Sequence, residues 1–305
     1  MRIIKANAKL VEHSVPEYQF IERVGRTCYK SEDKMTDTST INFIEGLVKR
    51  GHMAMLEHEY IYAKVDCDSI ECMMDITAEK YINSYCGYIS GSFRAFSEAI
   101  NATDNQVYDD LKVLLSKKYP EVFNYDIKDE GYGTVRLLTR EQFITEVTEK
   151  FGADKLFRLL PHTVLFTCDR GVTHELVRHR PVAFAMESTR YCSYDKGKFG
   201  NEITVIKPLF FEEGSEQYNI WKQSCEDSEK AYMSLINARA KAQEARSVLN
   251  NSIKADIWMT ATEEEWQHII DLRYHGTTGA PHPQMKEVMS IAYEQLVKAS
   301  DNRIK

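Results

Sequence analysis

The run HTVLFTCD at residues 162–169 is the feature that most limits how this chain can fold. Its apolar and β-branched residues predict a buried strand. The next stretch predicts a short helix, 173–180, which Pro181 stops because a residue before proline is driven out of the α region. The tripeptide Arg-His-Arg at 178–180 is therefore expected at a helix C-terminus, from which its side chains spread as the chain becomes extended.

Cationic and hydroxyl side chains gather just beyond this helix. Ser188 and Arg190 lie two positions apart, a pairing that suits phosphate oxygens. Taken singly, the tripeptide is ordinary helix-end capping, and this second motif is a salt-bridged surface loop beside Glu187. Arg246 and Arg273 add remote arginines, however, in a chain whose formal net charge is -7. A cationic cluster on an acidic protein favours a small phosphorylated ligand over DNA or RNA.

Hydrophobic periodicity predicts further elements along the chain. Strands are expected at 2–11, 59–65 and 252–260, and helices at 40–50, 69–84 and 215–249. Thr262 with Glu265 fits a capping box that opens one more helix. No convincing linker divides the chain, so a single domain over residues 1–305 is expected.

Composition and local motifs indicate the compartment in which the protein is expected and the kinds of site that it is expected to lack. The seven cysteines are scattered without a Cys-x-x-Cys pair, so reduced thiols in the cytoplasm are the simplest expectation. The N-terminus has no apolar signal segment and no run is long enough to span a bilayer, so neither export nor a membrane is expected. His52, Glu57 and His58 have the wrong spacing for a zinc motif, and no metal site is expected.

The segment RHRPVAFAMESTRY resembles the signature Arg-His-Arg, seven residues, Ser-x-Arg of the flavin-dependent thymidylate synthases. This pattern is long and fixed in spacing, so it is far more specific than a glycine-rich loop. Shorter resemblances lie at RTCYKS (26–31), GHMAMLEH (51–58), ARSVL (245–249) and IIDLR (269–273). The resemblance covers roughly residues 1–68 and 160–300, so the region at about 69–160 is expected to be an insertion.

The resemblance implies an α+β fold, with a mixed, largely antiparallel sheet flanked by helices and a helical portion. It also implies bound FAD and reductive methylation of dUMP to dTMP. In that reaction methylenetetrahydrofolate gives the carbon and NADPH reduces the flavin. The family is typically a homotetramer whose sites are shared between subunits, so a homotetramer is expected.

Residue roles also follow from the resemblance. Arg273 is expected at the pyrimidine edge as the catalytic residue, where a guanidinium favours loss of the N3 proton and raises electron density at C5. The residues expected to contact FAD are Arg178, His179, Arg180, His268, Thr262 and Ala54. Those expected to bind the nucleotide are Glu175, Arg178, Glu187, Ser188, Thr189, Arg190, Arg246 and Arg273.

Several positions depart from the family pattern. Glu175 stands where a glutamine is frequent, and a nucleotide phosphate would repel it unless it faces the base or pairs with Arg178. Residues 185–186, Ala-Met, replace polar residues often found before Ser-x-Arg. Flavin-contacting positions differ as well, at Thr262, His268 and Ala54.

Three other functions stay open. A thymidylate synthase with a cysteine nucleophile needs an activated thiolate, usually in a Pro-Cys-His tripeptide that the sequence lacks; Cys192 beside Arg190 is expected to pack instead. A non-catalytic module that binds nucleotides or nucleic acid would use the arginines with Tyr191 and Tyr194, but the acidic balance opposes it. A related flavoprotein that acts on another pyrimidine nucleotide is compatible with the same motif.

Overall fold

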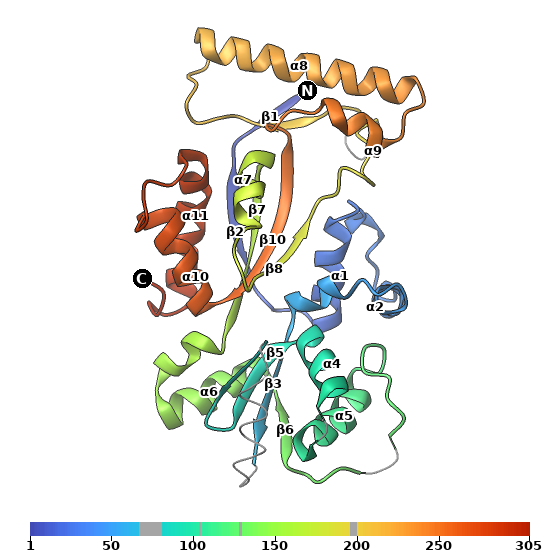
Figure 1. The fold of residues 1–305 in the computed structure, drawn as a ribbon, viewed down its shortest axis with the longest axis vertical. Coiled ribbons are helices and arrows are strands. Elements are labelled where there is room, and N and C mark those ends of the chain that lie inside the picture. Colours follow the sequence, from blue (N-terminus) through green and yellow to red (C-terminus); the bar gives the residue numbers. More distant parts are fainter. Residues whose placement is uncertain (67–80, 104, 128–129, 196–199) are drawn as a thin grey trace.

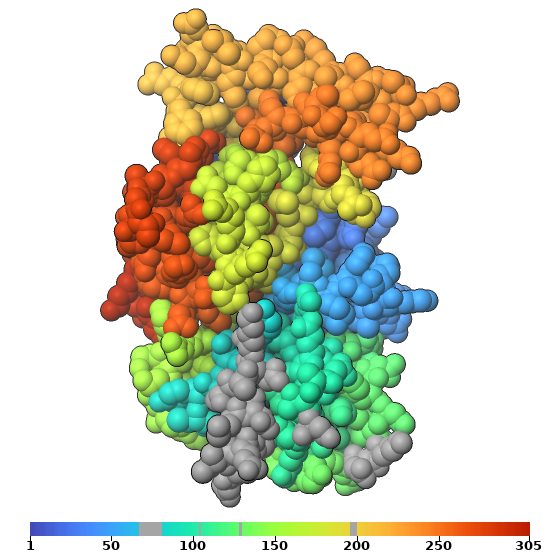
Figure 2. All heavy atoms as spheres, in the orientation of Figure 1, coloured from blue at the N-terminus to red at the C-terminus, as the bar shows by residue number. Residues whose placement is uncertain are grey.

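The computed structural model describes residues 1–66, 81–103, 105–127, 130–195 and 200–305. These residues form three parts stacked along the long axis of the molecule (Figure 1). A helical cap lies at one end, a sheet flanked by helices lies in the middle, and a second sheet with its own helices lies at the other end. The same order is visible in the space-filling view (Figure 2).

The middle part is built on a four-stranded antiparallel sheet in the order β2-β7-β10-β8. Its strands are β2 (Asn7–Val11), β7 (Pro161–Asp169), β8 (Ala183–Met186) and β10 (Lys254–Thr262). The buried strand predicted at 162–169 is confirmed as β7, which pairs with β2 on one side and β10 on the other.

Both faces of this sheet are covered. One face packs against α7 (Arg170–Leu176), α10 (Glu263–Ile270) and α11 (Pro283–Ala299) through a core that includes Phe166 and Trp266. The opposite face packs against α1 (Glu17–Thr27), where Phe20 and Val24 meet Ala185 and Trp258. Alternate side chains of each strand point to opposite faces. The set on the first face is apolar, whereas the set on the α1 face also contains polar side chains such as Asp256 and Thr260.

The second sheet has the order β4-β5-β3-β6 and is also antiparallel. Its strands are β3 (Tyr60–Val65), β4 (Ile82–Tyr85), β5 (Tyr88–Ser92) and β6 (Val135–Leu138). The accompanying helices are α4 (Phe93–Ala102), α5 (Gln106–Lys118) and α6 (Arg140–Phe151), with the short turn η3 (Ala153–Arg158).

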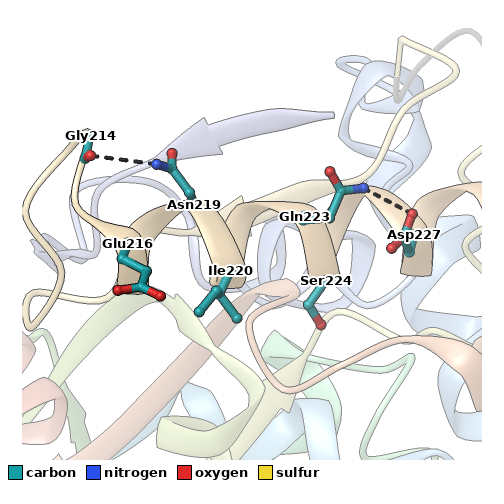
Figure 3. Close-up of a pocket in the computed structure, with 7 residues that line it drawn as sticks. All are labelled: Gly214, Glu216, Asn219, Ile220, Gln223, Ser224 and Asp227. Atoms are coloured by element: carbon teal, nitrogen blue, oxygen red, sulfur yellow. Dashed lines mark hydrogen bonds between the residues drawn. The ribbon is translucent and has the colours of Figure 1, made fainter.

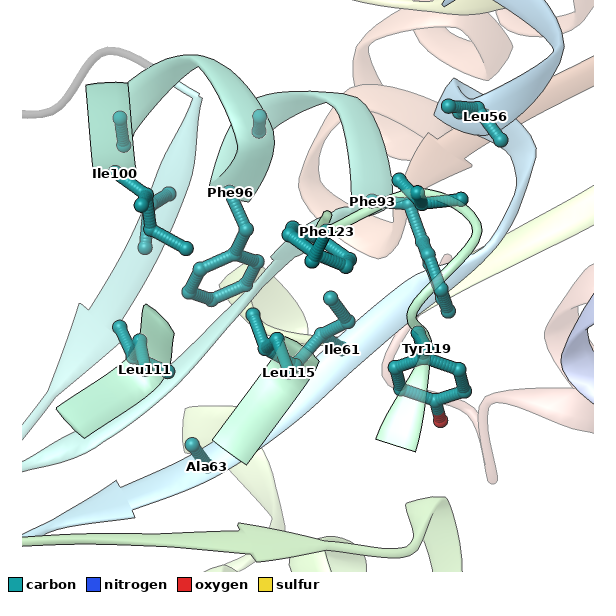
Figure 4. Packing of buried hydrophobic residues seen from close by; sticks show 14 of the residues in the cluster. Leu56, Ile61, Ala63, Phe93, Phe96, Ile100, Leu111, Leu115, Tyr119 and Phe123 are labelled. Carbon is teal, nitrogen blue, oxygen red and sulfur yellow. The ribbon is translucent and has the colours of Figure 1, made fainter. Parts of the chain in front are cut away.

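Two apolar cores hold this second part together. Phe143 and Val147 of α6 pack with Tyr62 and Tyr88 in one of them. The other core joins α4 and α5 to β3 (Figure 4) and also takes in Ile21 of α1 and two side chains of α2 (Ser39–Lys49). The second sheet is therefore packed into the N-terminal helices and is continuous with the rest of the molecule.

The cap contains the long helix α8 (Glu216–Asn237), followed by α9 (Ala242–Ala245) and the single turn η5 (Arg246–Val248). Beneath α8, β1 (Arg2–Ile4) pairs in parallel with β9 (Thr204–Ile206) (Figure 1). Two further short turns are η1 (Glu32–Lys34) and η2 (Met53–His58), and the latter leads into β3.

The predicted α+β class with a largely antiparallel sheet is confirmed, and several element predictions need correction. The strand expected at 2–11 is divided, since β1 pairs with β9 while β2 pairs with β7. Of the helix expected at 69–84, residues 69–80 lie outside the described part of the chain, and the prediction is wrong from Ile82, where β4 begins. No helix in the described ranges is apolar over a length that could cross a membrane.

The helix expected at 215–249 is wrong beyond Asn237. Arg239 adopts a left-handed conformation with φ 71°. The amide of Ala240 donates to the carbonyl of Leu235 at 2.9 Å, and the amide of Arg239 donates to that of Ile236 at 2.8 Å. These two bonds close a Schellman-type end. Glycine usually takes the left-handed position, and an arginine there gives no sequence signal.

Candidate functional site

The Arg-His-Arg tripeptide lies just after α7. Asp169 caps this helix by accepting a bond from the amide of Val172 at 3.0 Å, and the helix ends at Leu176. Along the following turn Arg178 and Arg180 are exposed, whereas the side chain of His179 is buried. The two guanidiniums are thus open to a ligand, and the imidazole points into the protein.

Arg273 is fixed by two residues that the sequence motif placed near the site. Its Nε donates to Nε2 of His179 at 3.1 Å, and its Nη1 contacts Oε2 of Glu175 at 3.2 Å. Burial, together with the charges of Arg273, His268 and Arg178, lowers the pKa of His179 to about 4. The imidazole is therefore neutral near pH 7 and can accept the bond from Arg273.

Arg273 owes its position to an irregular turn. Residues Asp271–His275, labelled η6, form a π-helical turn that continues α10, and Gly276 ends it with a positive φ of 74°. Single π turns are rare and often occur at functional sites. A pocket of about 340 Å³ lies against this turn and is lined by Arg178, Leu272, Arg273, Thr278, Gly279, Ala280, Pro281 and His282.

A second group of expected residues meets at the loop after β8. Arg246, presented by η5 of the cap, donates from Nη1 to Oγ1 of Thr189 at 3.4 Å. The hydroxyl of Ser188 accepts a bond from the amide of Arg190 at 3.2 Å. The cap and the loop thus bring together residues that are far apart in the sequence.

The two groups stay separate within the described part of the chain. No hydrogen bond or ion pair among its residues joins Arg246 and Thr189 to the Arg273 cluster. The connection is strand β8, whose preceding turn carries the tripeptide and whose following loop carries Ser188–Arg190. Arg178, Arg180, Arg190 and Arg246 also make no ion pair with any described carboxylate, although the chain has 46 Asp and Glu residues.

The remaining predicted residues have different surroundings. Thr262 caps α10 and accepts a bond from the amide of Glu265 at 3.4 Å. His268 is exposed on that helix, close enough to His179 for its charge to affect the pKa of that imidazole. Ala54 is exposed on η2. Glu187 is buried, and its carboxylate accepts a bond from Nζ of Lys254 at 2.7 Å.

Sequence reasoning missed the charged residues under the Ser188–Arg190 loop. Lys254 and Asp256 occupy alternate positions of β10 and share a contact of 2.6 Å, and Lys30 bonds to the same aspartate. Arg170 donates from Nη2 to the carbonyl of Glu187 at 2.8 Å. A signal was available, because two charges at alternate positions of an otherwise apolar predicted strand have to face the same way.

A different hollow lies along α8 in the cap. It has a volume of about 890 Å³ and is lined by Gly214, Glu216, Asn219, Ile220, Gln223, Ser224 and Asp227 (Figure 3). Its charged groups are the carboxylates of Glu216 and Asp227, which repel a phosphate. None of the expected site residues lines it, so it is a weaker candidate than the arginine-bearing pocket.

Comparison with known proteins agrees with the motif. The family profile described as thymidylate synthase complementing protein matches residues 98–300. A flavin-dependent thymidylate synthase of Pyrococcus furiosus is 29% identical over 136 residues, which cover 45% of this chain and 54% of the relative. A flavin-dependent thymidylate synthase of Pyrococcus abyssi is 28% identical over 149 residues, 44% of this chain and 60% of the relative. The chain thus spans little more than half the length of these curated relatives.

Among solved structures, a UMP/dUMP methylase, PolB, from Streptomyces cacaoi bound to 5-Br dUMP is similar with a TM-score of 0.42 and 14% identity. The match covers 98% of this chain and 93% of that one. The profile match extends over more than half of the chain, and it confirms the family indicated by the Arg178–Arg190 signature. The chain belongs to the thymidylate synthase complementing protein family.

Proposed function

We propose that this protein is a flavin-dependent thymidylate synthase that methylates dUMP to dTMP. In this reaction methylenetetrahydrofolate supplies the carbon, and NADPH reduces bound FAD. The observation that carries the proposal is Arg273, which faces a pocket with Arg178 and is oriented by His179 and Glu175. Family membership and the names of the curated relatives support the same reaction.

The side chains fit a phosphorylated cofactor. Arg178 and Arg180 are exposed guanidiniums without an ion pair among the described residues, as a pyrophosphate requires. His268 and Thr262 lie on and at the start of α10, in the same part of the molecule. Ala54 can contribute only its backbone and its methyl group. When bound, the flavin supplies the hydride that no side chain can provide.

The chain's own residues bind and polarise the nucleotide. Ser188, Arg190 and Arg246 hold its phosphate, with Thr189 already bonded to Arg246. Arg273 donates to the pyrimidine edge and stabilises the anion that remains after loss of the N3 proton, which raises electron density at C5. Glu175 contacts Arg273, so its carboxylate lies on the pyrimidine side of the site and away from the phosphate. Glu187 supports the phosphate-binding loop from beneath.

We extend the proposal to the assembly and the insertion. A homotetramer with shared sites is supported by the separation of the two residue groups within one chain and by Ile220 on α8, a large apolar residue that is 64% exposed. Residues at about 69–160 are proposed to be an insertion in a single catalytic domain. A cytoplasmic location is proposed from the class of substrate, since free nucleotides and folates are intracellular metabolites.

The proposal is tested by the visible spectrum and by turnover. The FAD-loaded protein should bleach when NADPH is added, and it should form dTMP from dUMP when methylenetetrahydrofolate is also present. Other pyrimidine mononucleotides are then added as competitors. Arg273→Ala should keep flavin bound and lose about 10²–10³-fold in turnover, the cost typical of removing one group that stabilises a developing anion. Arg158→Ala is a matched control, because Arg158 is exposed and its one ion pair among the described residues is with Glu264. A protein that binds neither FAD nor dUMP would reject the assignment.

A further inference from the structure

A group of four charged side chains, of which Glu187 is buried and the other three are partly buried, lies beneath the loop that carries Ser188–Arg190. Nζ of Lys254 contacts Oε2 of Glu187 at 2.7 Å and Oδ2 of Asp256 at 2.6 Å. Lys30 bonds to Asp256 and lies 3.6 Å from Oε2 of Glu187. The exposed fraction is 2% for the side chain of Glu187 and 15% for those of Lys254 and Asp256. We call these four residues the ion cluster.

The register of the middle sheet builds the ion cluster. Asp256 of β10 lies opposite Thr167 of β7, whose hydroxyl donates to Oδ1 of the aspartate at 2.8 Å. On the other side, the amide of Glu187 donates to the carbonyl of Asp256 at 2.9 Å and extends the β8–β10 ladder by one residue. Lys254 is two positions before Asp256 and faces the same way. The ion cluster therefore lies at the end of the sheet where β8 leads into the Ser188–Arg190 loop.

Electrostatic interactions favour the charged forms of two members of the ion cluster, Lys30 and Asp256. Burial opposes the charge of Lys30, but the carboxylates of Glu187 and Asp256 outweigh it and raise its pKa above the ordinary value. Burial likewise opposes the charge of Asp256, and the ammonium groups of Lys254 and Lys30 lower its pKa despite it. Lys30 and Asp256 are thus both ionised near pH 7.

The turn that carries Lys30 also contacts the Ser188–Arg190 loop directly. The carbonyl of Cys28 accepts a bond from the amide of Ser188 at 3.0 Å. The rings of Tyr29 and Tyr191 have centroids 5.3 Å apart. Each residue of Cys28–Lys30 therefore contacts the loop in a different way. Cys28 bonds to its backbone, Tyr29 contacts a ring, and Lys30 lies beside Glu187.

We infer that Glu187 and Lys254 are positioning residues for nucleotide binding, which fix the base of the loop so that Ser188, Thr189 and Arg190 face the phosphate. This inference rests on the proposed function. The carboxylate of Glu187 is buried and engaged by Lys254, so it is unavailable to the substrate. A buried ion pair adds little net stability against an apolar pair of similar volume, but its geometry is specific. Such a pair suits a site that must hold donors within a fraction of an ångström.

The test uses calorimetry to measure the dUMP affinity of the FAD-loaded protein as purified and the FAD affinity of the same protein after the flavin is removed. Steady-state kinetics of the loaded protein give kcat and KM. Glu187→Gln and Lys254→Met should weaken dUMP binding and raise its KM by about tenfold or more, as expected for a displaced binding group. FAD affinity and kcat at saturating dUMP should change little. Lys254→Arg, which keeps the charge, should recover most of the loss.

Arg303→Met is the matched control, because it breaks another buried pair, with Glu263, away from the loop. It should lower the thermal midpoint while leaving the dUMP affinity unchanged. Equal dUMP affinity in wild type and in Glu187→Gln would overturn the inference, as would an equal loss of FAD and dUMP binding. Should Glu187→Gln fail to fold, Lys30→Met decides by the same criteria. A wild-type protein that binds FAD but no dUMP would reject the proposed function instead.

Discussion

At the scale of single residues, the surroundings of His179 shift the pKa of its imidazole. Burial, followed by electrostatic interactions with Arg273, His268 and Arg178, lowers its pKa to about 4 from an ordinary value of 6.5. We expect its ring signals in a nuclear magnetic resonance titration to change near pH 4, and to move toward 6.5 in Arg273→Ala because the nearest charge is lost. A titration near 6.5 in the wild type would contradict the geometry of the cluster.

The lowered pKa of His179 also makes the free energy of unfolding depend on pH. Because the folded protein binds a proton at His179 less readily than the unfolded chain does, this residue reduces the free energy of unfolding as pH falls from about 6.5 toward about 4. Above that window the imidazole is neutral in both states and has no such effect.

Residue types in the site were predictable, but their orientations were not. The signature identified Arg178, Arg190 and Ser188 because basic and hydroxyl groups at fixed spacing suit phosphate. It did not reveal that Glu175 would pair with Arg273, since the two are 98 positions apart and only the folded chain brings them together. The burial of Glu187 beside Lys254 was not predicted either, because strand register decides which way a side chain faces.

At the scale of elements, the π turn η6 depends on Gly276. Its φ is 74°, and a Cβ built there would lie 3.0 Å from the carbonyl oxygen of Gly279 and 3.1 Å from Cδ of Pro281. Gly276→Ala should lower the free energy of unfolding by about 1–2 kcal/mol through the left-handed backbone, with an added cost from these contacts. It should also weaken dUMP binding, because Arg273 lies on the same turn.

Gly51→Ala separates the cost of the left-handed backbone from the cost of the close contacts made by a Cβ at position 276. Gly51 has a similar φ of 68°, but a Cβ there would meet nothing within 4 Å. Chemical denaturation should therefore show a smaller loss for Gly51→Ala than for Gly276→Ala. Equal losses would mean that the contacts around Gly276 relax freely.

Elements were most predictable where a single pattern was strong. The apolar run at 162–169 and the strand-like segment at 252–260 predicted β7 and β10 with small errors at their ends. The end of α8 was missed because its left-handed residue is Arg239, and the sequence offers neither glycine nor proline there. The division between β1 and β2 was missed because each half pairs with a different sheet, which depends on partners remote in the sequence.

At the scale of the whole molecule, the second sheet shares a core with the N-terminal helices. Phe93 and Phe96 of α4 belong to the same apolar cluster as Ile21 of α1 and Ile44 of α2 (Figure 4 shows the α4 side of it). The other face of α1 packs on the middle sheet through Phe20. Helix α1 therefore connects the two sheets, and we expect them to unfold together.

The distribution of tryptophan allows this coupling to be measured. All three tryptophans (Trp221, Trp258 and Trp266) lie outside the second sheet and its helices, so their fluorescence reports on the middle part and the cap. Phe96→Ala, at a fully buried position of the second part, should cost about 3–5 kcal/mol through lost burial and a cavity. Because the core is shared, the fluorescence-monitored midpoint should fall together with that seen by circular dichroism. An unchanged fluorescence transition, with an earlier partial loss of dichroism, would show that the second sheet unfolds by itself.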